Sequence, residues 1–169
     1  MAMGEPDEDR RRQVAAVIME DPLSAGIVGG GHESSRLFLE AGGCYIHGFF
    51  AAALLCAHGS CERELAGRVA AIAAPPAGWQ KWGLGALIKE AVSRGWYSAA
   101  TIELLKATNE KRRDFFHFRG LWDDGTIATR TLAQRPWGHK SEADEFMSSV
   151  LAEDAFEAIK AAFAIRRDR

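Results

Sequence analysis

The sequence predicts an all-α protein: a helical bundle of four to five helices with short peripheral helices. Alternating apolar and polar runs of β-branched residues are nearly absent, and alanine, leucine, glutamate, lysine and arginine dominate the patterned segments. Hydrophobic residues make up 47% of the chain and charged residues 26%, an ordinary globular composition that argues against disorder. A chain of 169 residues is normally one domain with a substantial core.

The N-terminal region, residues 1–33, is predicted to hold one short helix and a glycine-rich loop. We expect the helix over about residues 9–20, ended by the Asp-Pro pair at positions 21 and 22. Residues 26–32 contain four glycines and are expected to form the loop. The loop lacks the Gly-Lys-Ser/Thr ending of a phosphate-binding P-loop, so we do not predict nucleotide binding there.

The helical bundle itself is predicted over residues 34–165. The first helix is long and carries two adjacent glycines, Gly42 and Gly43, where we expect a bend. The bundle helices that the apolar pattern predicts span approximately 34–72, 84–93, 98–118 and 141–165.

Breaker and capping residues define the predicted ends of these helices. The loop 73–78 ends the first helix, Gly95 stops the second, and Ser98 is the N-cap candidate of the third. Residues 120–138 are rich in turn-forming residues and are predicted to be an irregular insertion. Residues 166–169 form a basic segment that we expect to be a frayed, solvated tail.

Charge and cysteine content restrict the class of partner and the cellular location. The net charge of −2 is close to neutral, so any contact with nucleic acid must be local. Three cysteines without CxxC spacing fit a reducing compartment. The polar N-terminus lacks the apolar core of a signal peptide, and the longest apolar run, residues 49–57, is shorter than the roughly 20 residues of a membrane span. We therefore expect a cytoplasmic protein that does not enter a membrane.

The helix predicted over residues 98–118 places a charge among apolar residues. At about 100° per residue, Asn109 and Arg112 fall on the same face as three apolar side chains. A guanidinium there is costly to desolvate unless it has a partner or lines a wet cleft. Two interpretations remain open: a structural arginine paired with Glu62 or Glu64, or a cation set into a functional cleft.

His117 follows on the same helix and makes the functional interpretation concrete. An imidazole titrates near neutral pH, at about 6.5, and therefore suits proton transfer. A guanidinium keeps its charge and matches two phosphate oxygens, so Arg112 suits a phosphate. Together the two groups could serve phosphoryl chemistry without a metal. Arg113 lies closer to His117 around the helix and could share the role of Arg112.

These residues carry a resemblance to a known family. The sequence RRDFFH at residues 112–117 resembles the R-x4-6-H motif of HEPN domains in its four-residue form. Upstream, residues 51–65 look like the long first helix of these domains, with a small-residue face and a glutamate near its end. Residues 84–96 are similar to the segment before the motif helix, and residues 152–159 to the closing helix. The resemblance covers about residues 33–165.

The resemblance implies a bundle that dimerises so that two motifs face one cleft, as in metal-independent ribonucleases. His117 would then activate the ribose 2′-hydroxyl or protonate the leaving oxygen, and Arg112 would hold the scissile phosphate. A 2′,3′-cyclic phosphate would be the product. Arg113, Asn109 and Glu62 are the auxiliary candidates. The resemblance implies no metal and no cofactor, a homodimer, and RNA as the substrate.

Two departures from the family pattern leave alternatives open. Arg113 stands where a small polar residue is common, so either arginine could act with His117. Arg119 stands where a variant of the motif has tyrosine, which makes an arrangement with an antitoxin less expected. Some family members are not catalytic, so the alternatives are a binding or regulatory module in stress response or defence, with a protein partner, and a helical interaction protein whose motif is only structural.

Two further patterns invite a functional interpretation. Cys44, His47, His58 and Cys61 have mirrored metal-ligand spacings, but on one helix the two histidines would lie about 16 Å apart, so we expect core packing rather than a single site. Zinc bridged between chains is the remaining alternative. The five tryptophans cluster near predicted helix ends and loops, where we expect them to close the bundle rather than stack bases.

Overall fold

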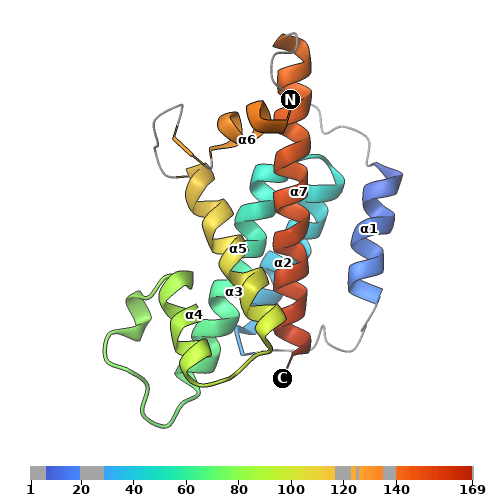
Figure 1. Cartoon of the computed structure of the whole chain (residues 1–169). Coiled ribbons are helices and arrows are strands. Elements are labelled where there is room, and N and C mark those ends of the chain that lie inside the picture. The colour runs from blue at the N-terminus through green and yellow to red at the C-terminus, as the bar shows by residue number, and fades with distance from the viewer. Residues whose placement is uncertain (1–6, 20–28, 117–122, 125, 135–139, 169) are drawn as a thin grey trace.

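The computed structural model describes residues 7–19, 29–116, 123, 124, 126–134 and 140–168. This part of the chain contains seven α-helices and no strand, so the predicted all-α fold is confirmed (Figure 1). A single 3₁₀ turn, η1 (Trp79–Lys81), precedes the fourth helix. The α-helices are α1 (Glu8–Met19), α2 (Gly31–Ile46), α3 (Phe50–Ala70), α4 (Leu84–Ser93), α5 (Ala99–Phe116), α6 (Ile127–Gln134) and α7 (Lys140–Arg167).

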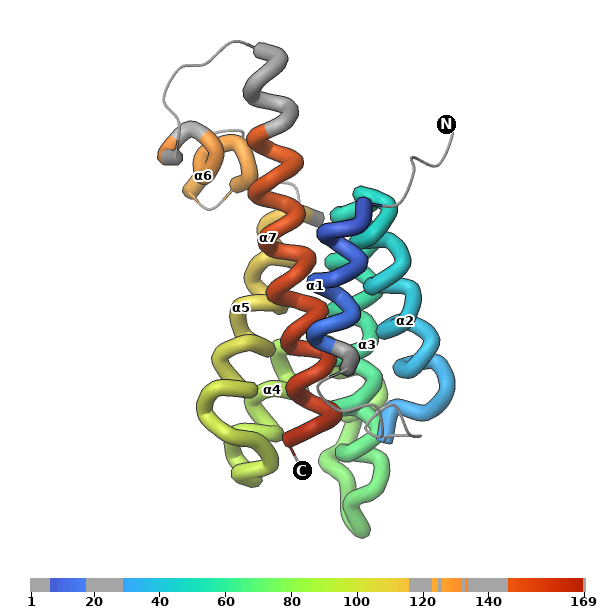
Figure 2. Tube along the Cα trace, turned by 90° about the vertical axis from the view of Figure 1, so that its right-hand side faces the viewer, coloured from blue at the N-terminus to red at the C-terminus, as the bar shows by residue number. Residues whose placement is uncertain are grey.

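Helix α3 lies at the centre of the bundle, with α2, α4, α5 and α7 packed around it. Its inward face combines small and large residues that are completely buried: Ala53, Leu54, Ala57, Cys61 and Leu65. The small residues let neighbouring helices approach closely, and the leucines fill the space between them. Helix α1 covers the outer side of the bundle against α2 and α7 (Figure 2).

The predicted long helix over residues 34–72 is wrong, because the chain reverses within it. Helix α2 ends at Ile46 and α3 begins at Phe50, and Gly48 between them has φ of +78°. A residue with a side chain rarely adopts that backbone conformation, so glycine is favoured at this turn. Gly42 and Gly43, where a bend was expected, both lie inside α2, and the chain reverses only after that helix ends at Ile46.

The ends of α1 and α4 agree with the sequence. Helix α1 begins and ends within one residue of its prediction, and α4 has the predicted bounds. Gly95 has φ of +62°, its N–H donates to the Val92 carbonyl, and the next N–H, of Trp96, donates to the Ala91 carbonyl. These two bonds form a Schellman motif, which confirms Gly95 as the stop of α4.

Ser98 is confirmed as the N-cap of α5. Its hydroxyl accepts a hydrogen bond from the Thr101 N–H at 3.3 Å, and its own N–H donates to Asp168 at 2.7 Å. We expect Ser98→Ala to lower the free energy of unfolding by about 1 kcal/mol, because a helix N–H loses its side-chain acceptor. Urea denaturation measures the change. Ser149→Ala, on the exposed surface of α7, is the matched control and should change stability by less than about 0.5 kcal/mol.

Two segments predicted to be irregular contain helix. Within the predicted insertion 120–138, residues 127–134 form α6, although 120–122, 125 and 135–138 lie outside the described residues. Helix α7 begins one residue before its predicted start and continues to Arg167, so the prediction of a frayed, solvated tail is wrong for Arg166. That side chain is only 2% exposed.

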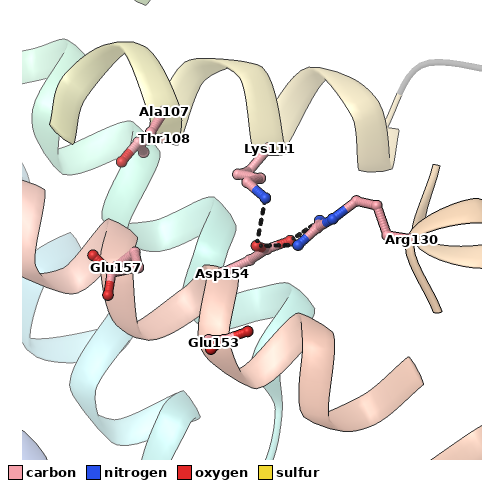
Figure 3. Close-up of a pocket in the computed structure, with 7 residues that line it drawn as sticks. All are labelled: Ala107, Thr108, Lys111, Arg130, Glu153, Asp154 and Glu157. Carbon is pink, nitrogen blue, oxygen red and sulfur yellow. Dashed lines mark hydrogen bonds and ion pairs between the residues drawn. The ribbon is translucent and has the colours of Figure 1, made fainter. Parts of the chain in front are cut away.

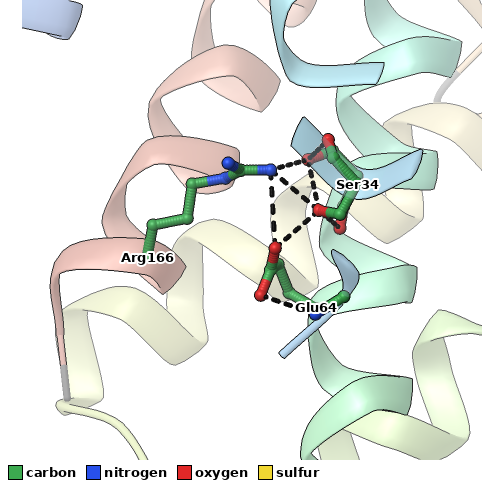
Figure 4. A network of polar contacts seen from close by, with 5 residues as sticks. Ser34, Glu64 and Arg166 are labelled. Atoms are coloured by element: carbon green, nitrogen blue, oxygen red, sulfur yellow. Dashed lines mark hydrogen bonds and ion pairs between the residues drawn. The ribbon is translucent and has the colours of Figure 1, made fainter. Parts of the chain in front are cut away.

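Arg166 is held by polar groups from two other helices, which explains its burial (Figure 4). Its Nη2 donates to the Ser34 hydroxyl at 2.7 Å and to the Ser60 hydroxyl at 3.0 Å, and it lies 3.5 Å from Glu64 Oε1. Ser34 also donates to Glu64 at 2.6 Å. These four residues, named here the Arg166 network, join α2, α3 and α7 inside the core.

The network also bears on one open alternative for Arg112. Glu64 was one of two carboxylates considered as its partner. In the structure Glu64 faces Arg166 instead, and its second oxygen, Oε2, accepts the Gly30 N–H at 3.2 Å.

Candidate functional site

A pocket between α3, α4 and α5 brings together three of the residues singled out in the sequence. Its volume is about 270 Å³, and Arg112, Asn109 and Glu62 all line it. We call it the α3–α5 pocket. Its remaining lining residues are His58, from α3, and the segment that begins α4: Gly83, Leu84, Gly85 and Ala86.

The helices place these side chains through regular spacing. Asn109 and Arg112 are three residues apart on α5, and His58 and Glu62 are four residues apart on α3, so each pair shares one helix face. Because α3 and α5 pack against each other, the two pairs line the same pocket. The pocket is therefore built on rigid elements rather than on loops.

The beginning of α4 forms the third wall and is fastened to α3. Glu62 Oε2 accepts a hydrogen bond from the Leu84 N–H at 2.9 Å. This N–H is one of those at the start of α4 that have no acceptor within the helix. The negative carboxylate is also favourable next to the positive end of the helix dipole. At Gly85 a Cβ would lie 3.4 Å from the Asn109 amide nitrogen, an ordinary contact distance, so the start of α4 is a direct neighbour of Asn109.

His58 is buried, with 8% of its surface exposed, and three polar neighbours influence the charge of its imidazole. Burial is the main cause that lowers the pKa of its imidazole below 6.5, and the positive charge of Arg112 lowers it further. The negative charge of Glu62 and a hydrogen bond with Asn109 act in the opposite direction. The net effect is a lowered pKa, so His58 is neutral at pH 7.

The two candidate arginines have different surroundings. Arg112 is half-buried and lines the α3–α5 pocket. Arg113 is exposed on α5, and its Nε lies 3.5 Å from the carboxylate of the adjacent Asp114. This contrast favours Arg112 as the arginine of the site. His117 lies outside the described residues, so its pairing with either arginine stays a prediction.

Sequence reasoning missed His58 as a member of the site. It was grouped with Cys44, His47 and Cys61 and expected to pack in the core. That expectation is correct for Cys61, which is fully buried and whose thiol pKa burial raises to about 12. It also holds for His58, which is buried, but His58 lines the α3–α5 pocket as well. Its spacing of four residues from Glu62 was the signal available in the sequence.

Among the described residues, no three histidine, cysteine or acidic side chains come together as a metal site. Trp79, Trp82 and Trp96 are partly buried and pack against the core at η1 and beyond the end of α4, as predicted for residues that close the bundle. Trp122 and Trp137 lie outside the described residues.

A second pocket, of about 210 Å³, lies where α5, α6 and α7 meet (Figure 3). Asp154 on α7 accepts two hydrogen bonds from Arg130, at 2.6 and 2.9 Å, and one of its oxygens lies 3.1 Å from Lys111 Nζ. The bond to Asp154 is the main cause that raises the pKa of Arg130. We name these three residues the Asp154 cluster. Its charges are mutually paired, so it attaches α6 to the bundle.

Comparison of the chain with models of protein families, with curated protein sequences and with solved structures finds no match in any of the three. In the part of the chain that the structure describes, no helix combines the length and the apolar composition needed to cross a lipid bilayer.

Proposed function

We propose that the protein is a metal-independent endoribonuclease of the HEPN type that acts as a homodimer in the cytoplasm. Arg112 binds the scissile phosphate, and His117 serves as a general acid or base. The observation that carries the proposal is the position of Arg112, half-buried in the wall of a polar pocket beside Asn109 and Glu62.

The pocket has properties that suit a phosphodiester. The guanidinium offers several donors in one plane, which match the oxygens of a phosphate and stabilise the charge that develops on it. Gly83 and Gly85 contribute backbone but no side chain to the lining of this pocket of about 270 Å³. A single guanidinium at the pocket also fits the near-neutral net charge of the chain, since affinity for RNA would come from local contacts.

The proposed dimer places two R-x4-6-H motifs at one cleft. RNA cleavage through the 2′-hydroxyl needs a base, an acid and a cation at the phosphate, and two motifs facing one cleft provide more of these groups than one. The dimer predicts a particle of twice the chain mass in light scattering at micromolar concentration. A monomer at all concentrations that support activity would contradict this part of the proposal.

The proposal is tested by RNA cleavage in EDTA. We expect the wild-type chain to cut 5′-labelled single-stranded RNA and to leave 2′,3′-cyclic phosphate ends. His117→Ala should lower kcat/KM by about 100-fold or more, the usual effect of losing an acid-base group. Arg112→Ala should lower it by a similar factor, whereas Arg113→Ala should have a much smaller effect.

The control is His32→Ala, which removes an exposed histidine of α2 and should leave activity unchanged. Circular dichroism and melting curves establish that each variant is folded. If the folded wild-type dimer leaves a panel of single-stranded RNAs intact, the enzyme proposal fails. The non-catalytic binding or regulatory module then becomes the better description.

A further inference from the structure

We infer that His58 is a second acid-base residue of this site, the general base that accepts the proton of the ribose 2′-hydroxyl, with Asn109 as its positioning residue. The inference rests on the proposed ribonuclease function and adds a residue from a different helix to it. It assigns the α3–α5 pocket to the reacting ribose and phosphate. The substrate class is a ribonucleotide chain, because the 2′-hydroxyl is the group on which His58 acts.

The location of His58 is the first argument. It shares the α3–α5 pocket with Arg112, although the two side chains come from α3 and α5. Both helices are anchored by completely buried residues, Cys61 on α3 and Leu105 on α5, so the core fixes the relative position of the two groups. A phosphate bound to Arg112 would therefore hold its ribose beside His58 in a constant geometry.

The charge state of His58 is the second argument. The charged residues that line the pocket with it are Glu62 on α3 and Arg112 on α5, while α4 contributes none. Burial and Arg112 outweigh Glu62 and Asn109, so the pKa lies below 6.5 and the ring is neutral at pH 7. A neutral imidazole can accept a proton at once, which is what a general base requires.

Asn109 lines the same pocket, and hydrogen bonding between its amide and the imidazole acts to raise the His58 pKa. An imidazole has two nitrogens, and a partner on one of them fixes the ring orientation and the tautomer. The other nitrogen then remains as the proton acceptor. An asparagine that orients a histidine in this way is familiar from cysteine proteases.

The chemical step needs two groups with opposite protonation. His58 removes the proton from the 2′-hydroxyl, and the 2′-oxygen attacks phosphorus and forms the new P–O2′ bond. The P–O5′ bond breaks, and the 5′-oxygen takes a proton from protonated His117. The products are a 2′,3′-cyclic phosphate and a 5′-hydroxyl. One proton moves to His58 and one leaves His117, so exchange with water restores both residues for the next cycle.

The two roles can be separated with a pair of substrates that differ in the leaving atom. One oligonucleotide carries a single ribonucleotide with the natural 5′-oxygen, and the other has 5′-sulfur at the same bond. A thiolate leaves without protonation, so 5′-sulfur compensates for a missing acid but not for a missing base. We expect His58→Ala to lower kcat/KM about 100-fold or more on both substrates. His117→Ala should be impaired on the oxygen substrate and restored on the sulfur substrate.

Two further measurements distinguish a general-base role of His58 from a purely structural one. Imidazole added to folded His58→Ala should restore part of the activity, which it would not do for a variant that is merely destabilised. In the wild type, the hydrogen bond with Asn109 raises the His58 pKa. Asn109→Ala removes it and should therefore move the acid limb of the kcat/KM profile to lower pH. A purely structural asparagine would lower activity without moving the limb.

The experiments separate failure of the proposed ribonuclease function from failure of the role assigned to His58. If the wild-type chain cleaves neither substrate, the proposed function fails and the role of His58 fails with it. If wild type is active, His117→Ala is impaired and His58→Ala keeps the wild-type rate, only the inference about His58 is overturned. Restoration of His58→Ala by the sulfur substrate would make His58 the acid and would also overturn the assignment. Failure of imidazole to restore a folded His58→Ala protein counts against the base role as well.

Discussion

Replacing Glu64 with alanine is expected to lower the free energy of unfolding by about 3–5 kcal/mol, because the change removes the carboxylate that faces a buried guanidinium. Arg166 is 2% exposed and lies 3.5 Å from Glu64 Oε1, and Ser34 would lose its acceptor at 2.6 Å. Water cannot replace the lost charge easily at this depth. Urea or thermal denaturation, followed by circular dichroism, measures the effect.

Glu40→Ala is the matched control for this prediction. Glu40 also pairs with an arginine, Arg36, at 2.7 Å, but both side chains are exposed on α2. Loss of that pair should cost less than about 1 kcal/mol. The double variant, Glu64→Met with Arg166→Met, should lose less unfolding free energy than the two single variants lose together, because no charge of this pair is then left in the core. Equal effects of Glu64→Ala and Glu40→Ala would show that the Arg166 network is energetically unimportant.

The second large effect is expected at Asp154, where alanine should lower the free energy of unfolding by about 2–3 kcal/mol. Asp154 is 6% exposed and carries both the bidentate contact with Arg130 and the contact with Lys111. The value lies below that for Glu64, because Arg130 and Lys111 are partly exposed and water screens them after the change.

The loss at Asp154 should also have a local signature. Arg130 belongs to α6, so hydrogen exchange should become faster at the amides of α6 than at those of α3. Glu153→Ala is the control, since it removes a neighbouring, exposed carboxylate of the same pocket and should change little. Unchanged exchange in α6 upon Asp154→Ala would mean that other contacts attach this helix.

Local signals in the sequence predicted those elements whose ends depend on their own residues. Helix α4 has its predicted bounds because Gly95 can adopt a positive φ and close a Schellman motif within the same few residues. The cap at Ser98 is local in the same way. Helix periodicity also predicted that Asn109 and Arg112 share one face of α5, and both line one pocket with Glu62 of α3.

Features that depend on distant parts of the chain were not predicted. The reversal at Gly48 was not predicted, because the adjacent glycines 42 and 43 are the stronger signal for a break in the sequence. Both lie inside α2, and Gly42 packs against Val14 of α1. The burial of Arg166 depends on residues that lie more than a hundred positions earlier. His58 was missed because its role appears only when α5 is packed against α3.

The Arg166 network has a consequence for the order in which the chain folds. Ser34 and Arg166 are 132 positions apart, so the loop that their contact closes is long and its closure has a high entropic cost. We therefore expect this contact to form late in folding. The hairpin of α2 and α3 relies on near neighbours and can form early. During synthesis Ser34, Ser60 and Glu64 emerge long before Arg166 and stay hydrated until α7 is complete. We therefore expect refolding to proceed through a species with α2 and α3 paired and α7 still undocked.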